Sequence, residues 1–177
     1  HDPATGELDE QHPDIAHDLA HPTAPRSAPG IIAEALRRRF DEGIDPFAVL
    51  SCDNLPNNGL TTRRIVCRFA RLRDPELGDK IETDVVFPST MVDRIVPATT
   101  AEVKADVAAA LGVDDAWPVV SEPFTQWVIE SRFPAGRPQF EAAGGEMVGD
   151  VAPFETMKLR MLNGSHSTLA YLGYLAG

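Results

Sequence analysis

The stretch that decides the fold reads PFETMKLRMLNGSHSTLAYLGYLAG and spans residues 153–177. It contains no proline after Pro153, starts with long-chain helix formers and repeats apolar residues at helical spacing, which predicts a single helix. From Ser167 onward it is apolar on nearly every side. We therefore expect this helix to run through a protein interior.

Polar side chains share the apolar face of this expected helix. At about 100° per residue, an arc of roughly 140° holds Glu155, Lys158, Leu159, Leu162, Asn163, His166 and Leu169. An ordinary surface helix separates leucines from charged groups. Burying an amine, an amide and an imidazole is unfavourable unless each has a partner or a chemical task. The pattern therefore indicates a functional face.

Composition places the chain among ordinary folded proteins. Its residues are 43% hydrophobic and 24% charged, which is ordinary for a folded protein. A length of 177 residues is enough for one domain with a sizeable core or for parts of two. A formal net charge of −11 disfavours nucleic acid and anionic membranes as partners. No apolar run reaches the roughly 18 residues of a membrane helix. Cys52 and Cys67 lack metal-ligand spacing and are interpreted as buried free thiols of a cytoplasmic protein.

The two ends of the sequence suggest a longer polypeptide. The chain starts at His1 without a methionine, and it stops at Gly177 directly after an apolar run. We interpret it as an internal piece that is inactive on its own.

Residues 1–29 contain five prolines and are predicted to be turn-rich. Three histidines lie among them, at His12, His17 and His21. Their spacings of five and four would suit a metal site, but the flanking prolines argue against a rigid scaffold. A solvated loop is therefore favoured over a metal site.

Residues 30–97 show the order of elements of an α/β fold. An amphipathic helix, a short buried strand, a second helix and a further strand are predicted at residues 30–42, 47–52, 61–71 and 84–87. Ligands of α/β sheets bind at the carboxyl ends of strands. Asp53 and Asn54 directly follow the first strand, so both are candidate site residues. The alternative is a turn or helix cap, which is favoured for Asn57 and Asn58 and equally plausible for Asn54.

The second half of the chain offers one candidate carboxylate. Asp93 and Arg94 lie between apolar pairs, either as a salt-bridged pair or as a carboxylate that sets the charge of an amine. Elsewhere we expect a helix over 98–111 capped by Thr99 or Thr100, two strands within 119–130 and a short helix near Glu141. The sequence contains no GxSxG, HExxH, GxxxxGK[ST] or GxGxxG motif.

Four blocks, in this order, resemble the polyol-specific long-chain dehydrogenases, the family of mannitol 2-dehydrogenase and fructuronate reductase (D-mannonate oxidoreductase). The blocks are SCDNLPNNG (51–59), FPSTMVDRIVP (87–97), SEPFTQWVIE (121–130) and PFETMKLRMLNGSHSTLAYLGYL (153–175). The resemblance covers essentially the whole chain, and the opening residues are most similar to the fructuronate reductase branch.

The resemblance implies an α/β fold with two parts. Residues 1–150 would form the C-terminal part of a Rossmann-like dinucleotide-binding domain that lacks its glycine motif. Residues 151–177 would be the first helix of a mainly helical substrate domain. The implied activity is zinc-independent hydride transfer between NAD or NADP, with NAD favoured, and a secondary alcohol of a sugar acid or polyol. The substrate pairs would be D-fructuronate/D-mannonate or D-fructose/D-mannitol, and the full-length protein would be a monomer without a metal.

The resemblance also assigns roles to residues. Lys158 would be the general acid/base, Asn54 and Asn163 would hold the substrate oxygen, and His166 would position the substrate. Asn54 would also lie at the cofactor. Asp93 would neighbour the lysine and Glu155 would lie on a proton path, so these two belong to the substrate and proton-path group.

The chemistry is consistent with these roles but leaves alternatives open. Burial among leucines would favour a neutral Lys158 amine, whereas Glu155 and Asp93 would favour the charged form, so the direction stays open. Two neutral amides can stabilise an oxyanion without quenching a base. One alternative is an inert piece or helical interaction module, in which Lys158 and His166 only pair with the carboxylates. Another is a divalent-metal site at Asp93 and His166.

Overall fold

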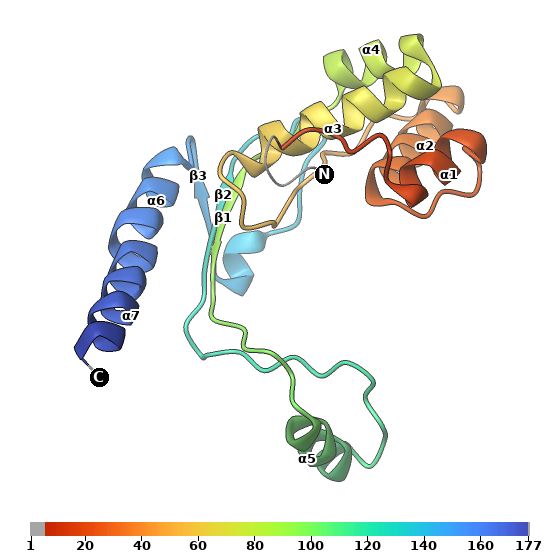
Figure 1. Cartoon of the computed structure of the whole chain (residues 1–177). Helices are drawn as coiled ribbons and strands as arrows, with labels where there is room; N and C mark the ends of the chain where they lie inside the picture. Colours follow the sequence, from red (N-terminus) through yellow and green to blue (C-terminus); the bar gives the residue numbers. More distant parts are fainter. Residues whose placement is uncertain (1–5, 177) are drawn as a thin grey trace.

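The computed structural model describes residues 6–176. Four helices lie at one end of a small sheet, a long helix lies on the other side, and a further helix is carried on an arm (Figure 1). The four helices are α1 (Pro13–Ala20), α2 (Ala28–Asp41), α3 (Asn58–Arg73) and α4 (Pro75–Asp84). They enclose the larger hydrophobic core, in which Leu36, Phe69 and Ile81 are almost completely buried.

The sheet has three strands in the described part of the chain, β1 (Thr90–Asp93), β2 (Gln126–Glu130) and β3 (Gly145–Val148), in that spatial order. β1 and β2 are antiparallel, with Thr90 opposite Ile129. β2 and β3 are parallel, with Trp127 opposite Gly145. Because β1 pairs on one side only, it forms an edge of the sheet.

The loop predicted for residues 1–29 is wrong for residues 13–20, which form α1. Pro13 is tolerated because it lies in the first turn of the helix, where its missing N–H is not needed. The rings of His17 and His21 stack with their centroids 4.7 Å apart. Within residues 6–176, no three His, Cys, Asp or Glu side chains are grouped as metal ligands. Residues 1–5 lie outside the described part.

The helices predicted at residues 30–42 and 61–71 are confirmed as α2 and α3, but the strands predicted at residues 47–52 and 84–87 do not form. A hydrogen bond from Val49 N to Val86 O, 2.9 Å long, joins the two segments without a ladder. Asp84 is instead the last residue of α4. A strand requires a series of bonds to a partner, which an apolar run does not reveal by itself. Because residues 47–52 are not enclosed in a sheet, Cys52 is exposed, contrary to expectation, whereas Cys67 is buried.

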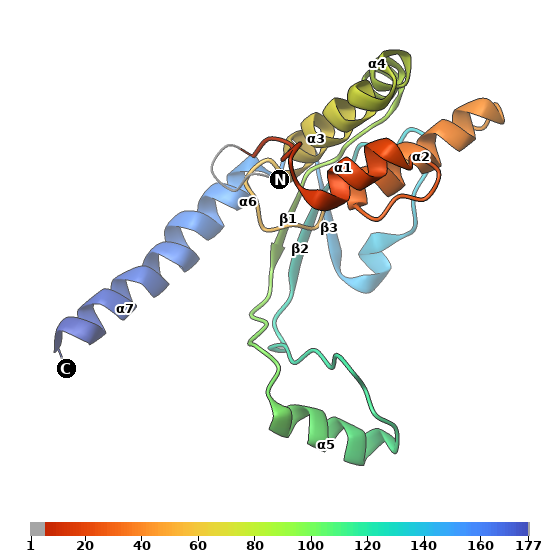
Figure 2. The ribbon, with the colours of Figure 1, turned by 45° about the vertical axis from the view of Figure 1, so that its right-hand side comes forward.

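The connection from β1 to β2 forms the arm, which carries α5 (Ala101–Leu111) well away from the sheet (Figures 1 and 2). Thr100 caps α5, as predicted, and accepts a hydrogen bond from Val103 N at 3.3 Å. Only residues 126–130 of the predicted strand pair at 119–130 are strand. The short helix expected near Glu141 is the 3₁₀ helix η1 (Phe140–Ala143), and β3 directly after it was not predicted.

The predicted C-terminal helix forms, but its middle turn is wider than an α turn. It consists of α6 (Ala152–Met157), the π-helical segment η2 (Lys158–Asn163) and α7 (Gly164–Ala176). The expectation that its apolar half is buried is wrong for this chain, because α7 extends away from the sheet and Tyr171 is 72% exposed (Figure 2). Among residues 6–176, no helix combines the length and apolar character that a membrane span requires.

Candidate active site

Lys158 is the centre of the candidate site. Its Nζ donates hydrogen bonds to Asn54 Oδ1 at 2.8 Å and to Val92 O at 2.7 Å. Asp93 Oδ1 lies 3.7 Å from the same nitrogen. The side chains of Lys158 and Asp93 are only 10% and 15% exposed. The structure therefore brings together three of the predicted site residues from segments that are far apart in the sequence.

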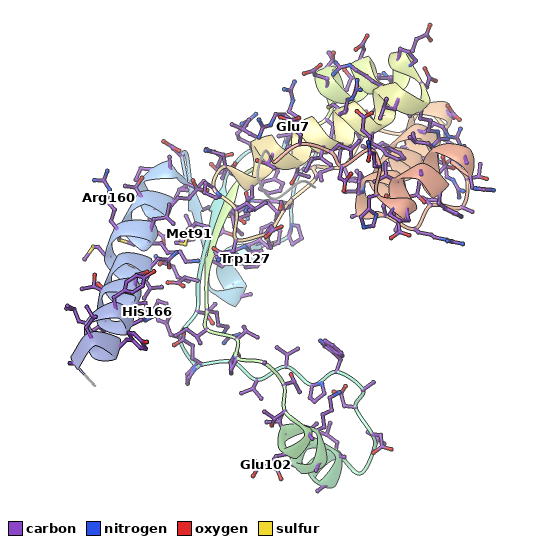
Figure 3. The ribbon with its side chains drawn as sticks, viewed as in Figure 1. Glu7, Met91, Glu102, Trp127, Arg160 and His166 are labelled. Carbon is purple, nitrogen blue, oxygen red and sulfur yellow. The ribbon has the colours of Figure 1, made fainter. Side chains whose placement is uncertain are left out.

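Packing of α6 against the sheet directs Lys158 toward β1. Val151, directly before α6, is 2% exposed and packs with Met91 of β1 and Val128 of β2. Phe154 of α6 adds to the same cluster. Figure 3 labels Met91 where the sheet faces this helix, and it shows Arg160 on the helix side that points away from the sheet. The small apolar cluster thus determines which face of the helix meets the end of β1.

Glu155 binds the loop of residues 53–57 at Asn57, whereas Lys158 binds it at Asn54. Glu155 lies about one helical turn before Lys158. Its Oε1 accepts a hydrogen bond from Asn57 N at 3.1 Å. Asn57 has a left-handed backbone with φ of 51°, which an asparagine tolerates better than most residues. Glu155 and Lys158 therefore hold the loop at two points, and the role of Glu155 on a proton path stays a prediction.

Asn163 is the last residue of the π-helical segment η2, His166 lies in α7, and both are exposed. Within residues 6–176, neither forms a hydrogen bond with Lys158. Gly164 N bonds to Leu159 O, five positions back, as in a π turn. Such a turn aligns residues five apart, so Lys158 and Asn163 are closer to one face than the predicted α-helical arc implies. Figure 3 shows His166 further along the same helix.

Sequence reasoning missed Asn58 and Thr90. Both are 1% exposed, and the Asn58 side chain forms hydrogen bonds with Thr90 and with the backbone of Asp53. The run Asn57-Asn58-Gly59 predicts a turn, and that local explanation gave no signal that the second asparagine would be buried. Gly59 is needed here because a Cβ would lie 2.7 Å from Phe87 O.

Asn54 offers a ligand a hydrogen-bond donor. Its Oδ1 is occupied by Lys158, and its Nδ2 forms no hydrogen bond within residues 6–176. A cavity of about 30 Å³ lies beside it, lined among others by Met91, Glu155 and Lys158. A space of this size accommodates a water or a group the size of a hydroxyl. The arrangement places an amine and an amide group beside one small cavity.

Two family models match the chain. The mannitol dehydrogenase Rossmann domain matches residues 4–142, and the mannitol dehydrogenase C-terminal domain matches residues 150–177. The chain belongs to the mannitol dehydrogenase family. The matches confirm the expected α/β fold class, a Rossmann-like domain leading into a mainly helical one. Asn54 and Asp93 lie in the part that matches the Rossmann domain of this family, and Lys158 lies in the part that matches its C-terminal domain.

Named relatives are similar over nearly the whole chain. The D-mannonate oxidoreductase of Escherichia coli (strain K12) is 55% identical over 99% of the chain and 36% of its own length. A structure of D-sorbitol dehydrogenase in substrate-free form has a TM-score of 0.88 at 46% identity, over 99% of the chain and 36% of that protein. The Pseudomonas fluorescens mannitol 2-dehydrogenase ternary complex with NAD and D-mannitol has a TM-score of 0.79 at 49% identity, over 94% and 34%. The chain thus spans about 36% of the length of the relatives that it matches.

Proposed function

We propose that this chain contributes the acid/base site of a dehydrogenase that oxidises a secondary alcohol of a polyol or sugar acid with NAD. The observation that carries the proposal is the Lys158 amine, held at 2.8 Å by Asn54 and at 2.7 Å by Val92 O beside a small cavity. We assign residues 1–150 to the dinucleotide-binding domain and residues 151–177 to the helical substrate domain.

The Lys158 amine would accept the hydroxyl proton during oxidation and return it to the carbonyl oxygen during reduction. Hydride acceptance is the chemistry that bound NAD supplies. The free Asn54 Nδ2 would donate a hydrogen bond to the same oxygen or to the cofactor, which fits a residue whose Oδ1 is already occupied. Asn163 would be the second amide donor, which the π turn at residues 158–163 favours. His166 would position the substrate from α7.

The named relatives support the choice of substrate pairs that we propose. A D-mannonate oxidoreductase is 55% identical and a mannitol 2-dehydrogenase structure is 49% identical to this chain. We therefore propose D-fructuronate/D-mannonate first and D-fructose/D-mannitol second. The solved complex of the second relative contains NAD, which supports NAD over NADP.

A substrate panel on the full polypeptide tests this proposal. D-mannonate, D-mannitol and D-sorbitol are each offered with NAD or NADP, and reduced nicotinamide is followed by absorbance. We expect turnover with at least one substrate, unchanged after dialysis against a chelator because the proton is moved by an amine. Absence of turnover with all of them would refute the function, and loss on chelation that a divalent metal restores would refute the metal-independent mechanism.

A further inference from the structure

Within residues 6–176, Asn58 forms no hydrogen bond with Lys158, yet its side chain is hydrogen-bonded to both segments that Lys158 binds. Its Nδ2 donates to Asp53 O at 2.8 Å, and Asp53 directly precedes Asn54. Its Oδ1 accepts from Thr90 N at 2.9 Å, two residues before Val92. Asn54 and Val92 supply the two oxygens that receive the Lys158 amine. Asn58 is therefore hydrogen-bonded one residue before the first acceptor of the lysine and two residues before the second.

The Asn58 amide pairs with Thr90 as a neighbouring strand would. It accepts from the Thr90 N–H and donates to the Thr90 C=O at 2.9 Å, so it satisfies both backbone groups of one residue. Thr90 begins β1, whose other side pairs with β2. The side chain thus closes the open edge of β1 at this position, where an unpaired buried peptide group would be unfavourable.

Thr90 adds a second connection to the loop. Its Oγ1 donates to Ser51 O at 2.7 Å and accepts from Asn58 Nδ2 at 3.1 Å. The Asn58 and Thr90 side chains therefore bind the loop at both Ser51 and Asp53. A buried network whose groups are all paired holds a single geometry, because any shift leaves a polar group without a partner.

We propose that Asn58, together with Thr90, is a positioning residue of the dehydrogenase. The pair sets the spacing between Asn54 Oδ1 and Val92 O and so fixes where the Lys158 amine lies. The chemical consequence rests on the proposed function of Lys158, whereas the effect on the position of the amine does not.

The first test is kinetic and uses Asn58→Asp, Thr90→Val and Thr90→Ser in the full polypeptide. Asn58→Asp replaces the donor by an oxygen that faces two carbonyls, and Thr90→Val removes the hydroxyl without changing the size of the side chain. We expect kcat to fall by about 10- to 100-fold with a smaller change in KM, since misplacement of about 1 Å can have this effect. The pH profile of kcat should shift, and Thr90→Ser should restore most of what Thr90→Val loses.

The second test does not depend on activity. An amine-directed acylating reagent is added in trace amount, and mass spectrometry measures the labelling rate of each lysine. Lys80 and Lys104, the two other lysines of the chain, are internal controls. We expect Lys158 to label several-fold faster in Asn58→Asp and in Thr90→Val, with Lys80 and Lys104 unchanged.

The outcomes separate the two proposals. Folded variants with an unchanged Lys158 labelling rate and an unchanged pH profile would overturn the positioning role. If Asn58→Asp does not fold, Thr90→Val decides, because it retains the shape of the side chain. If Lys158→Ala itself keeps normal turnover, the proposed function fails, while the labelling rates still show whether Asn58 positions the amine.

Discussion

Lys158 and Asn54 are 104 positions apart in the sequence, and the distance from Lys158 Nζ to Asn54 Oδ1 is 2.8 Å. The bond joins the segment that matches the family's Rossmann domain to the segment that matches its C-terminal domain. Proton transfer by Lys158 would therefore depend on how the two segments are docked.

The first prediction concerns Lys158 itself. In the full polypeptide, Lys158→Ala should lower kcat by about 10²- to 10⁴-fold, because a general acid/base contributes in this range. Small external amines should restore part of the rate, since only a proton carrier is missing. Lys104→Ala, on the distant α5, is the matched control. A stable, folded Lys158→Ala protein with nearly normal turnover would refute the catalytic role.

The second prediction concerns the two amides. Asn54→Ala and Asn163→Ala should each lower kcat by about 10²-fold, as expected for donors to a developing oxyanion. The double change of Lys158 and Asn163 to alanine should lower it by less than the product of the single effects, because both serve one step. The measurement is the steady-state kcat of the wild type, the two single variants at Lys158 and Asn163, and the double variant. Independent, multiplicative effects would separate Asn163 from the proton-transfer step.

The third prediction concerns acid stability at Asp18, which is completely buried. Burial alone would raise the pKa of its carboxyl, but hydrogen bonds from Ser27, His17 and the Arg26 backbone lower the pKa from 3.8 to about 2. A carboxyl with a lowered pKa stabilises the fold above its unfolded value, and this contribution is lost as pH falls from near 4 toward 2.

Urea unfolding at a series of pH values checks this linkage. Asp18→Asn should reduce stability at neutral pH and flatten the fall in unfolding free energy between about pH 4 and pH 2. Glu141→Gln is not a suitable control for this experiment, because Arg137 also lowers the pKa of Glu141 to about 2. An Asp18→Asn protein with the acid dependence of the wild type would contradict the assignment.

The fourth prediction compares a buried and an exposed ion pair. Glu34 is 6% exposed and binds Arg37, Arg38 and Arg73, with Arg73 Nη2 at 2.7 Å. Hydrogen bonding to Arg37 above all lowers the pKa of Glu34 to about 2. Glu34→Ala should lower the free energy of unfolding by on the order of 3 kcal/mol, because it removes the ion-pair partner of Arg73, whose side chain is only 11% exposed.

Glu141→Ala is the matched control, since its bidentate pair with Arg137 is at the surface. Exposed pairs are weak, so this change should affect the midpoint of urea unfolding far less. Equal losses in the two variants would show that burial does not distinguish the pairs.

The sequence by itself determined the elements that depend on neighbouring residues. Helical spacing predicted α2, α3 and the C-terminal helix, and a cap at Thr99 or Thr100 was predicted for the helix that the structure starts at Ala101. The block around Lys158 indicated both the family and the residue at the centre of the site. The helices follow from propensity, capping and spacing, which act over a few residues, whereas the family and the role of Lys158 came from the resemblance of the sequence blocks.

Only the tertiary structure decided the features that depend on distant partners. Residues 47–52 have the apolar pattern of a strand but do not form a ladder, and α7 is exposed although its sequence suggests an interior helix. The π turn has no local signal in the sequence. The sequence around Asn58 predicts a turn residue, and only the fold brings Thr90 N within 2.9 Å of its side-chain oxygen. A hydrogen bond between positions 32 apart depends on the docking of α3 and β1, and no local pattern encodes that distance.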